Sequence, residues 1–260
     1  MQVANELFDF PVELQGVKLR NGNPVPRARA IVRTDTGTAL PGLVSDRYHL
    51  FTHRQAVTAT QPFIDRFGEG SVVDYLERGG SRFVREYTFK AQALKVHVPK
   101  INEVVNLRVS VINNYGLKRA LLFRVGAMVL RCLNGMTIPG GEIELSFSHT
   151  GDMTKLTFPE PGVIEKLFEV AGEEWNYWAE RDVTLTHRDF ILEQTKALHV
   201  VTQKSFDAHR EKLDCVDISF WEYYNNFTNV MTHSAGKVQQ TSKLDRFDRL
   251  NAVFREAAAL

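Results

Sequence analysis

Apolar and polar residues alternate over the longest regular stretch of the chain, between residues 81 and 147. Phe83, Tyr87 and Phe89 share one parity. A period of two residues is typical of a strand that buries one face. The stretch therefore predicts several antiparallel strands. The same alternation recurs at Val105, Leu107, Val109 and Val111, at Leu121, Phe123, Val125, Ala127 and Val129, and at Ile143, Leu145 and Phe147.

A helical period replaces the alternation in two places. Thr52 is a candidate N-cap for a helix that reaches Gly68, and Pro62 is expected to split it into two pieces. After residue 159 the period is helical to the end. Pro161 marks one helix start, and Thr186 with Asp189 resembles a capping box.

These patterns predict an α+β protein. We expect a twisted antiparallel sheet in the N-terminal part, packed against C-terminal helices. Residues 1–158 form the β-rich, basic region with one helix, and residues 159–260 form the helical region. The two regions are expected to make one compact unit.

Charge is distributed unevenly along this plan. The stretch from Arg82 to Arg131 holds ten Lys or Arg residues and two acids, a balance of +8, whereas the whole chain carries +1. The remainder therefore sums to −7. A near-neutral total hides a basic sheet and an acidic partner region. The ten cations are Arg82, Arg85, Lys90, Lys95, Lys100, Arg108, Lys118, Arg119, Arg124 and Arg131.

A second basic strand face lies near the N-terminus. In the run RARAIVR, Arg27, Arg29 and Arg33 alternate with Ala28, Ala30 and Val32. Acids gather instead between residues 139 and 189, where eleven acids and four bases give a balance of −7. The acidic segment has the charge to neutralise the sheet within the molecule, so the charge counts also permit a covered basic face.

An open basic sheet would suit nucleic acid. Phosphates need spaced cations, and single strands also need aromatic rings on which bases stack. The alternative without a ligand is a solvated face, whose surface ion pairs would each contribute about 0–1 kcal/mol to stability. The candidate nucleic-acid-binding residues are Arg82, Arg85, Lys90, Arg108, Tyr115, Lys118, Arg119, Arg124 and Arg131.

Catalytic signatures are weak in this sequence. The run His233 to Lys237 lacks the glycine-rich lead of a phosphate loop, and no nuclease-type carboxylate–lysine spacing occurs. No two of the four histidines in the helical part are four residues apart, so a metal face on one helix is not expected. We expect no enzyme activity, no metal and no cofactor. These histidines are His187, His199, His209 and His233.

Membrane, export and cysteine signals in a sequence indicate its cellular compartment. No run approaches the ~20 apolar residues of a membrane helix. The start contains acids and no basic segment followed by an apolar one, so we expect a cytoplasmic protein without membrane contact. Cys132 and Cys215 are far apart and form no CxxC pair.

Two segments resemble a known family. The run INNYGLKRALLFRVGAMVLRCLNGM, with Arg131, Cys132, Asn134 and Gly135 near its end, is similar to an uncharacterised family of phage- and plasmid-borne proteins (domain of unknown function 932). The run SFWEYYNNFTNVMTHSAGK resembles the aromatic helix of the same family. The family's His-Asp-Gly turn is replaced by Asn113-Asn114-Tyr115-Gly116. The resemblance implies a protein of a mobile element and transfers no catalytic residue.

The sequence hypothesis is therefore a phage-type protein that binds nucleic acid along its phosphate backbone, holding or annealing single-stranded DNA as an oligomer. It predicts that neutralising Lys118 and Arg119 weakens binding. The alternative is a protein-binding module that inhibits a host defence enzyme through its acidic face, which would imitate DNA. The density of aromatic residues around Trp178 and Trp221 suits a core or an interface.

Overall fold

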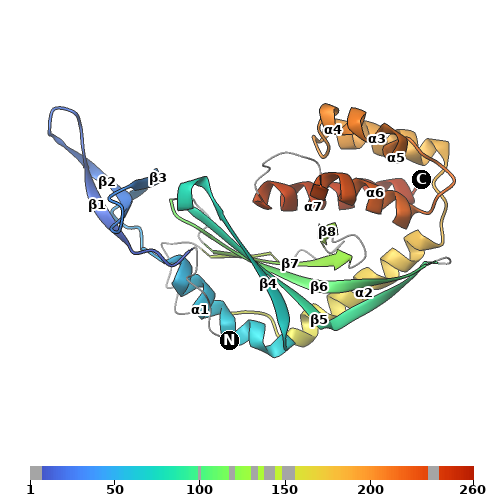
Figure 1. Cartoon of the computed structure of the whole chain (residues 1–260), viewed down its shortest axis with the longest axis horizontal. Helices are drawn as coiled ribbons and strands as arrows, with labels where there is room; N and C mark the ends of the chain where they lie inside the picture. The colour runs from blue at the N-terminus through green and yellow to red at the C-terminus, as the bar shows by residue number, and fades with distance from the viewer. Residues whose placement is uncertain are drawn as a thin grey trace. The chain divides into compact units, whose positions relative to one another are not determined.

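The computed structural model describes residues 8–98, 101–116, 121–129, 134–137, 144–147, 156–233 and 240–260. Strands fill the first part of the chain and helices the last part, so the α+β class is confirmed (Figure 1). The strands are β1 (Val12–Lys18), β2 (Pro24–Arg33), β3 (Ala39–Ser45), β4 (Gly70–Glu77), β5 (Arg82–Val98), β6 (Ile101–Asn114), β7 (Leu121–Val129), β8 (Asn134–Thr137) and β9 (Glu144–Phe147).

Helix α1 (His53–Ile64) is the helix of the β-rich part, and a 3-10 turn follows it at Asp65–Phe67. Thr52 caps it as predicted, and Gln55 completes a capping box. Pro62 lies inside the helix, so the predicted split is wrong. The C-terminal helices are α2 (Pro161–Ala179), α3 (Leu185–Ala197), α4 (Gln203–Ala208), α5 (Arg210–Leu213), α6 (Phe220–His233) and α7 (Gln240–Ala258).

Helix boundaries in the C-terminal part follow local signals. Pro161 is the first residue of α2, as predicted. The capping box of α3 is formed by Thr184 and His187, so the prediction of Thr186 with Asp189 is wrong by two residues. Thr184 accepts a hydrogen bond from the backbone of His187, whose ring accepts one from the backbone of Thr184.

Two sheets hold the strands. The first has the order β1-β2-β3, with antiparallel neighbours. The second has the order β4-β5-β6-β7-β8, and β9 also pairs with β7. A short 3-10 turn at Arg78–Gly80 joins β4 to β5.

The chain divides into two compact units, and the division does not follow the predicted boundary at residue 158. Strands β5, β6 and β7 each pass from one unit into the other, because each is long enough to contribute to two cores. The first unit comprises residues 1–87, 109–124 and 143–159, and the second comprises residues 88–108, 125–142 and 160–260.

Each unit has its own apolar core. In the first, Phe10 and Tyr115 pack with residues of β2 and β3, while Phe8 packs on Phe83 and Val57. In the second, the side chains of the helices form an aromatic core in which Trp175 lies 5.8 Å from Trp221 between ring centroids. Of the two roles expected for the aromatic residues around Trp178 and Trp221, core or interface, the structure shows the core role, whereas Tyr177 on α2 is half exposed. The fully buried members are Trp175, Trp178, Trp221, Tyr223 and Tyr224.

Candidate nucleic-acid interface

The predicted site residues lie on the long strands of the second sheet. Arg82, Arg85 and Lys90 belong to β5, Arg108 belongs to β6, and Arg124 belongs to β7. Tyr115 follows the end of β6. The remaining candidates, Lys118, Arg119 and Arg131, lie outside the described residues.

The central strands are buried on both faces. Every residue from Phe83 to Phe89 and from Val105 to Tyr115 is buried, including those of the parity expected to face solvent. Arg85 is 6% exposed and Arg108 is 4% exposed. The expected open row of cations is therefore wrong for this part of the sheet.

Arg85 is held by an acid of the neighbouring strand. Its guanidinium donates two hydrogen bonds of 2.8 Å to the carboxylate of Asp74 on β4. The same guanidinium lies over the ring of Phe8, 4.7 Å from its centroid. Burial opposes the charge, but the hydrogen bonds and the charge of Asp74 outweigh it and raise the pKa of Arg85. A bidentate, buried pair of this kind links β4 to β5. It leaves the guanidinium of Arg85 poorly accessible to a ligand.

Arg82 also has internal partners. It donates a hydrogen bond of 2.6 Å to the side-chain oxygen of Asn114, and its Nη1 lies 3.6 Å from Glu77. Arg124 is partly exposed, and its Cα lies opposite that of Glu144 in the register of β7 with β9. Among the candidates that the structure describes, Lys90 alone is exposed.

Tyr115 offers no face for a base. Its ring stacks on His53 with centroids 4.2 Å apart, and its hydroxyl accepts a hydrogen bond from the backbone of His53. Burial raises the pKa of Tyr115. His53 itself is fully buried, with Nε2 2.9 Å from Gly80 O and Nδ1 2.9 Å from the side-chain nitrogen of Asn113. This cluster joins α1 to the strands.

The first sheet presents a different set of cations. Lys18, Arg20, Arg27, Arg29 and Arg47 are all exposed. No ion pair joins any of them to a carboxylate of the described residues. Residues 12–47 contain six Lys or Arg residues and three acids, so this sheet carries a net charge of +3.

Arg33 is the one cation of this sheet with an acid partner in the described chain. It donates hydrogen bonds of 2.7 and 3.0 Å to Asp35, and its guanidinium lies over Phe10 at 4.0 Å from the ring centroid. The three predicted arginines of the RARAIVR strand are therefore divided. Arg33 anchors β2 to the core of the first unit, whereas Arg27 and Arg29 extend into solvent.

A large β-bulge presents Arg27. Gly16 of β1 pairs with Arg29, and Lys18 pairs with Pro24, so one residue of β1 lies opposite four residues of β2. Arg27 has φ +58°, in the left-handed region that arginine rarely adopts. Bulges re-aim side chains, and non-glycine residues in this region cost about 1–2 kcal/mol. The first sheet therefore holds Arg27 in a strained backbone conformation, and no ion pair with a described acid offsets the strain.

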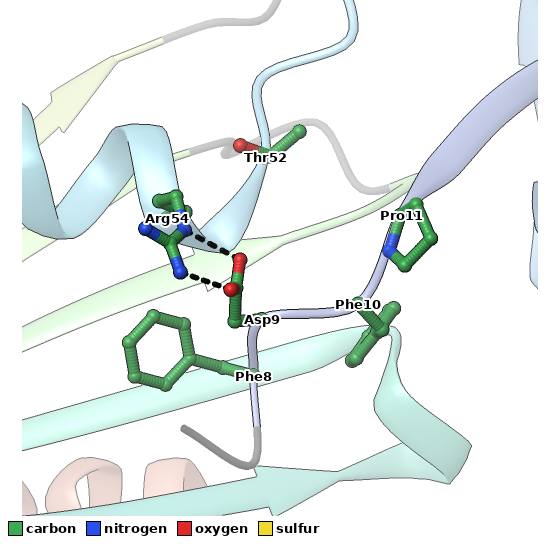
Figure 2. Close-up of a pocket in the computed structure, with 6 residues that line it drawn as sticks. All are labelled: Phe8, Asp9, Phe10, Pro11, Thr52 and Arg54. Atoms are coloured by element: carbon green, nitrogen blue, oxygen red, sulfur yellow. Dashed lines mark hydrogen bonds and ion pairs between the residues drawn. The ribbon is translucent and has the colours of Figure 1, made fainter. Parts of the chain in front are cut away.

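A small pocket lies where the N-terminal segment meets α1. Figure 2 shows Phe8, Asp9, Phe10 and Pro11 on one side, with Thr52 and Arg54 on the other. Its volume is about 380 Å³. Arg54 donates two hydrogen bonds to Asp9, which lower the pKa of the Asp9 carboxyl. Thr52 caps α1. The polar groups of the pocket thus bind one another, and we assign it no ligand.

Among the described residues, no group of three His, Cys, Asp or Glu side chains is placed to hold a metal ion. In the same part of the chain, no helix combines the length and the apolar character needed to span a bilayer.

Comparisons with known proteins return no relative. No family model matches the chain, and neither a curated protein nor a solved structure matches it significantly. The resemblance to the phage- and plasmid-borne family stays a prediction.

Sequence reasoning recognised the basic face of β2 but missed Lys18, Arg20 and Arg47. One signal could have found them. Between residues 11 and 47 there are only three acids and no aromatic residue, so the segment itself supplies few carboxylates and no aromatic side chain to cover its cations.

Proposed function

We propose that the protein binds nucleic acid along its phosphate backbone, through the cations of the β1-β2-β3 sheet. One observation carries the proposal: Lys18, Arg27 and Arg29 on the strands of this sheet, with Arg20 and Arg47 in the turns that follow β1 and β3, are exposed and have no ion pair with a described carboxylate. The proposal keeps the predicted ligand class and moves the site from β5–β7 to β1–β3.

Unpaired surface cations favour a polyanion for a physical reason. A cation that already has a carboxylate partner must exchange one ion pair for another, whereas an unpaired cation replaces only water. Each neutralised phosphate also releases condensed counterions, so affinity falls with salt. If all five cations contact phosphates of a duplex, the slope of log affinity against log salt reaches about −4.5.

A charge-matched pair of variants tests the proposal. In the first, Lys18, Arg20, Arg27 and Arg29 are all replaced by Gln. In the control, four exposed cations of the helical part are replaced by Gln, so the net charge changes equally. The control positions are Lys166, Lys204, Arg210 and Lys212.

Fluorescence anisotropy with labelled 20-base oligonucleotides, single- and double-stranded, measures affinity between 50 and 200 mM salt. We expect the Gln variant of Lys18, Arg20, Arg27 and Arg29 to bind at least about tenfold more weakly, and the slope of log affinity against log salt to become shallower by about 3.6. The control variant should change both quantities little. Equal losses in both variants contradict the site. Failure of the unaltered protein to bind any oligonucleotide at 50 mM salt contradicts the function.

The proposed binding has no catalytic step. Adding Mg²⁺ or Mn²⁺ to the same mixtures and resolving the oligonucleotides on a denaturing gel tests this directly. We expect full-length oligonucleotides after incubation, and metal-dependent shortening would assign the protein to the nucleases.

A second candidate function, binding a partner protein, is favoured by the outer face of α2. Val163, Val170 and Tyr177 lie seven residues apart and are 50%, 51% and 50% exposed. A seven-residue apolar spacing places the three side chains along one stripe of a helix. Exposed acids lie on the same helix, so the matching partner would be an amphipathic helix flanked by Lys or Arg. These acids are Glu169 and Glu173.

A double variant of α2 and a basic peptide distinguish the two candidate functions. Replacing Val163 and Val170 by Ser should leave oligonucleotide binding unchanged. A basic amphipathic peptide that binds the unaltered protein and loses affinity for this double variant would support the partner role, and equal affinity for both would contradict it.

A further inference from the structure

The turn of the β1-β2 hairpin begins with an apolar residue that lies between two cations in the sequence. Leu19 is 56% exposed, and its neighbours Lys18 and Arg20 are exposed as well. Hydrogen bonds define the turn: Leu19 N donates to Asn23 O at 2.8 Å, and Gly22 N donates to Leu19 O at 2.9 Å. The turn therefore has a defined hydrogen-bonded conformation and exposes a leucine to solvent. Exposing an apolar side chain to water costs free energy.

The hairpin continues as a two-stranded ribbon beyond the third strand. β3 pairs with β2 only between Ala28 and Val32. From Gly16 the strand advances two residues to its end at Lys18, about 7 Å at ~3.3 Å per residue, and the turn lies beyond it. Figure 1 shows this ribbon and its turn extending past β3. The grooves of B-DNA are about 8 Å deep, and the major groove admits a two-stranded ribbon. The length and width of the ribbon thus fit a groove.

The side chains of the ribbon suit a duplex better than a single strand. Binding a single strand needs aromatic rings on which the bases stack. Residues 11–47 contain no Phe, Tyr, Trp or His. The ribbon offers instead cations for phosphates and one exposed leucine, the combination that duplex-binding proteins use when an apolar side chain enters between base pairs.

We propose that the β1-β2 ribbon binds in a groove of double-stranded DNA, with Leu19 pressed against or between base pairs and the flanking cations on the phosphates. This inference rests on the proposed function and names its ligand. It replaces the single-stranded ligand expected from the sequence. Because a wedge unstacks and bends the duplex, flexible pyrimidine–purine steps should bind more tightly than stiff A-tracts.

Leu43 provides a matched control for Leu19. It lies on β3 of the same sheet and is 58% exposed, so Leu43→Ala removes the same side chain from a similar environment. Neither leucine is buried, and circular dichroism should show native folding in both variants. The probes are a 20-base-pair DNA duplex with donor and acceptor dyes at its ends, and one of its strands alone.

We expect the unaltered protein to bind the duplex at least about tenfold more tightly than the strand and to raise energy transfer by bending it. Leu19→Ala should lower duplex affinity about tenfold and abolish the bend, whereas Leu43→Ala should do neither. Equal affinity for strand and duplex, or equal behaviour of the two variants, overturns this inference while the proposed function stands. Absence of binding to either probe overturns both.

Discussion

Arg85 of β5 and Arg29 of β2 both belong to strands that are rich in arginine, and they have opposite environments in the structure. Arg85 is buried and hydrogen bonded to Asp74, whereas Arg29 is exposed without an acid partner in the described chain. The neighbouring strand makes the difference. Arg29 lies opposite Gly16 on one side and Val44 on the other, neither of which carries a charge.

A strand arginine is open to an external anion where its cross-strand neighbours carry no acid, and it is bound within the fold where a neighbour does. A buried ion pair matters for the stability of the fold, because removing one partner leaves the other charge buried without a counter-charge. An exposed, unpaired cation contributes little to stability and is available to an external anion. The two groups of arginines should therefore respond to mutation in opposite ways.

The largest expected effect is on stability at Arg85. Arg85→Ala leaves the Asp74 carboxylate without its bidentate partner and should lower the free energy of unfolding by about 3 kcal/mol. Arg29→Ala, at an exposed position, should change it by no more than about 0.5 kcal/mol. Urea denaturation followed by circular dichroism measures both. Similar values for the two variants would contradict the assigned roles.

The second effect concerns affinity. Arg29→Gln should remove one phosphate contact and reduce the salt slope of nucleic-acid binding by about 0.9. Lys90→Gln, at the one exposed candidate of β5 and β6, should leave the slope unchanged. The anisotropy titration described above measures both, and a larger change for Lys90→Gln would return the site to the second sheet.

The third effect concerns strain at the bulge. Arg27→Gly relieves a left-handed conformation worth about 1 kcal/mol, partly offset by the greater freedom of glycine in the unfolded chain, so stability should rise by about 0.5 kcal/mol. Arg29→Gly in regular strand should lower stability by about 1 kcal/mol. Thermal unfolding distinguishes the signs, and equal shifts would show that the bulge is not strained.

The last effect concerns an exposed cation that has an acid partner. Arg54 bonds Asp9, and Arg54→Ala should cost no more than about 1 kcal/mol near pH 7. The folded pKa of Asp9 lies below its ordinary value, so this contribution is present above pH ~4 and is lost as pH falls through the lowered pKa. Urea denaturation from pH 7 to pH 2.5 should show the two proteins converging.

Asp9→Asn is the matching control for this pH effect, because its amide does not titrate. Its difference from the unaltered protein should also shrink at low pH, whereas its difference from Arg54→Ala should stay constant. A gap between the unaltered protein and Arg54→Ala that persists at pH 2.5 would show that Arg54 acts through packing.

Local signals in the sequence predicted much of the fold. Thr52 and Pro161 mark helix starts in both the prediction and the structure, because capping depends on a few adjacent residues. The period of two residues predicted the strands of the second sheet. Local rules failed where a longer-range contact decides, as at Pro62, which stays within α1 while Phe63 and Ile64 are buried in the core.

The sequence by itself determined the α+β class and the concentration of cations in strands, since periodicity and charge are properties of single segments. Only the tertiary structure decided which cations face water, because that depends on whether a neighbouring strand supplies an acid, as Asp74 does for Arg85, or supplies Gly16 and Val44, as happens at Arg29. Strand pairing joins residues distant in sequence, and no local pattern encodes which residues will lie opposite one another.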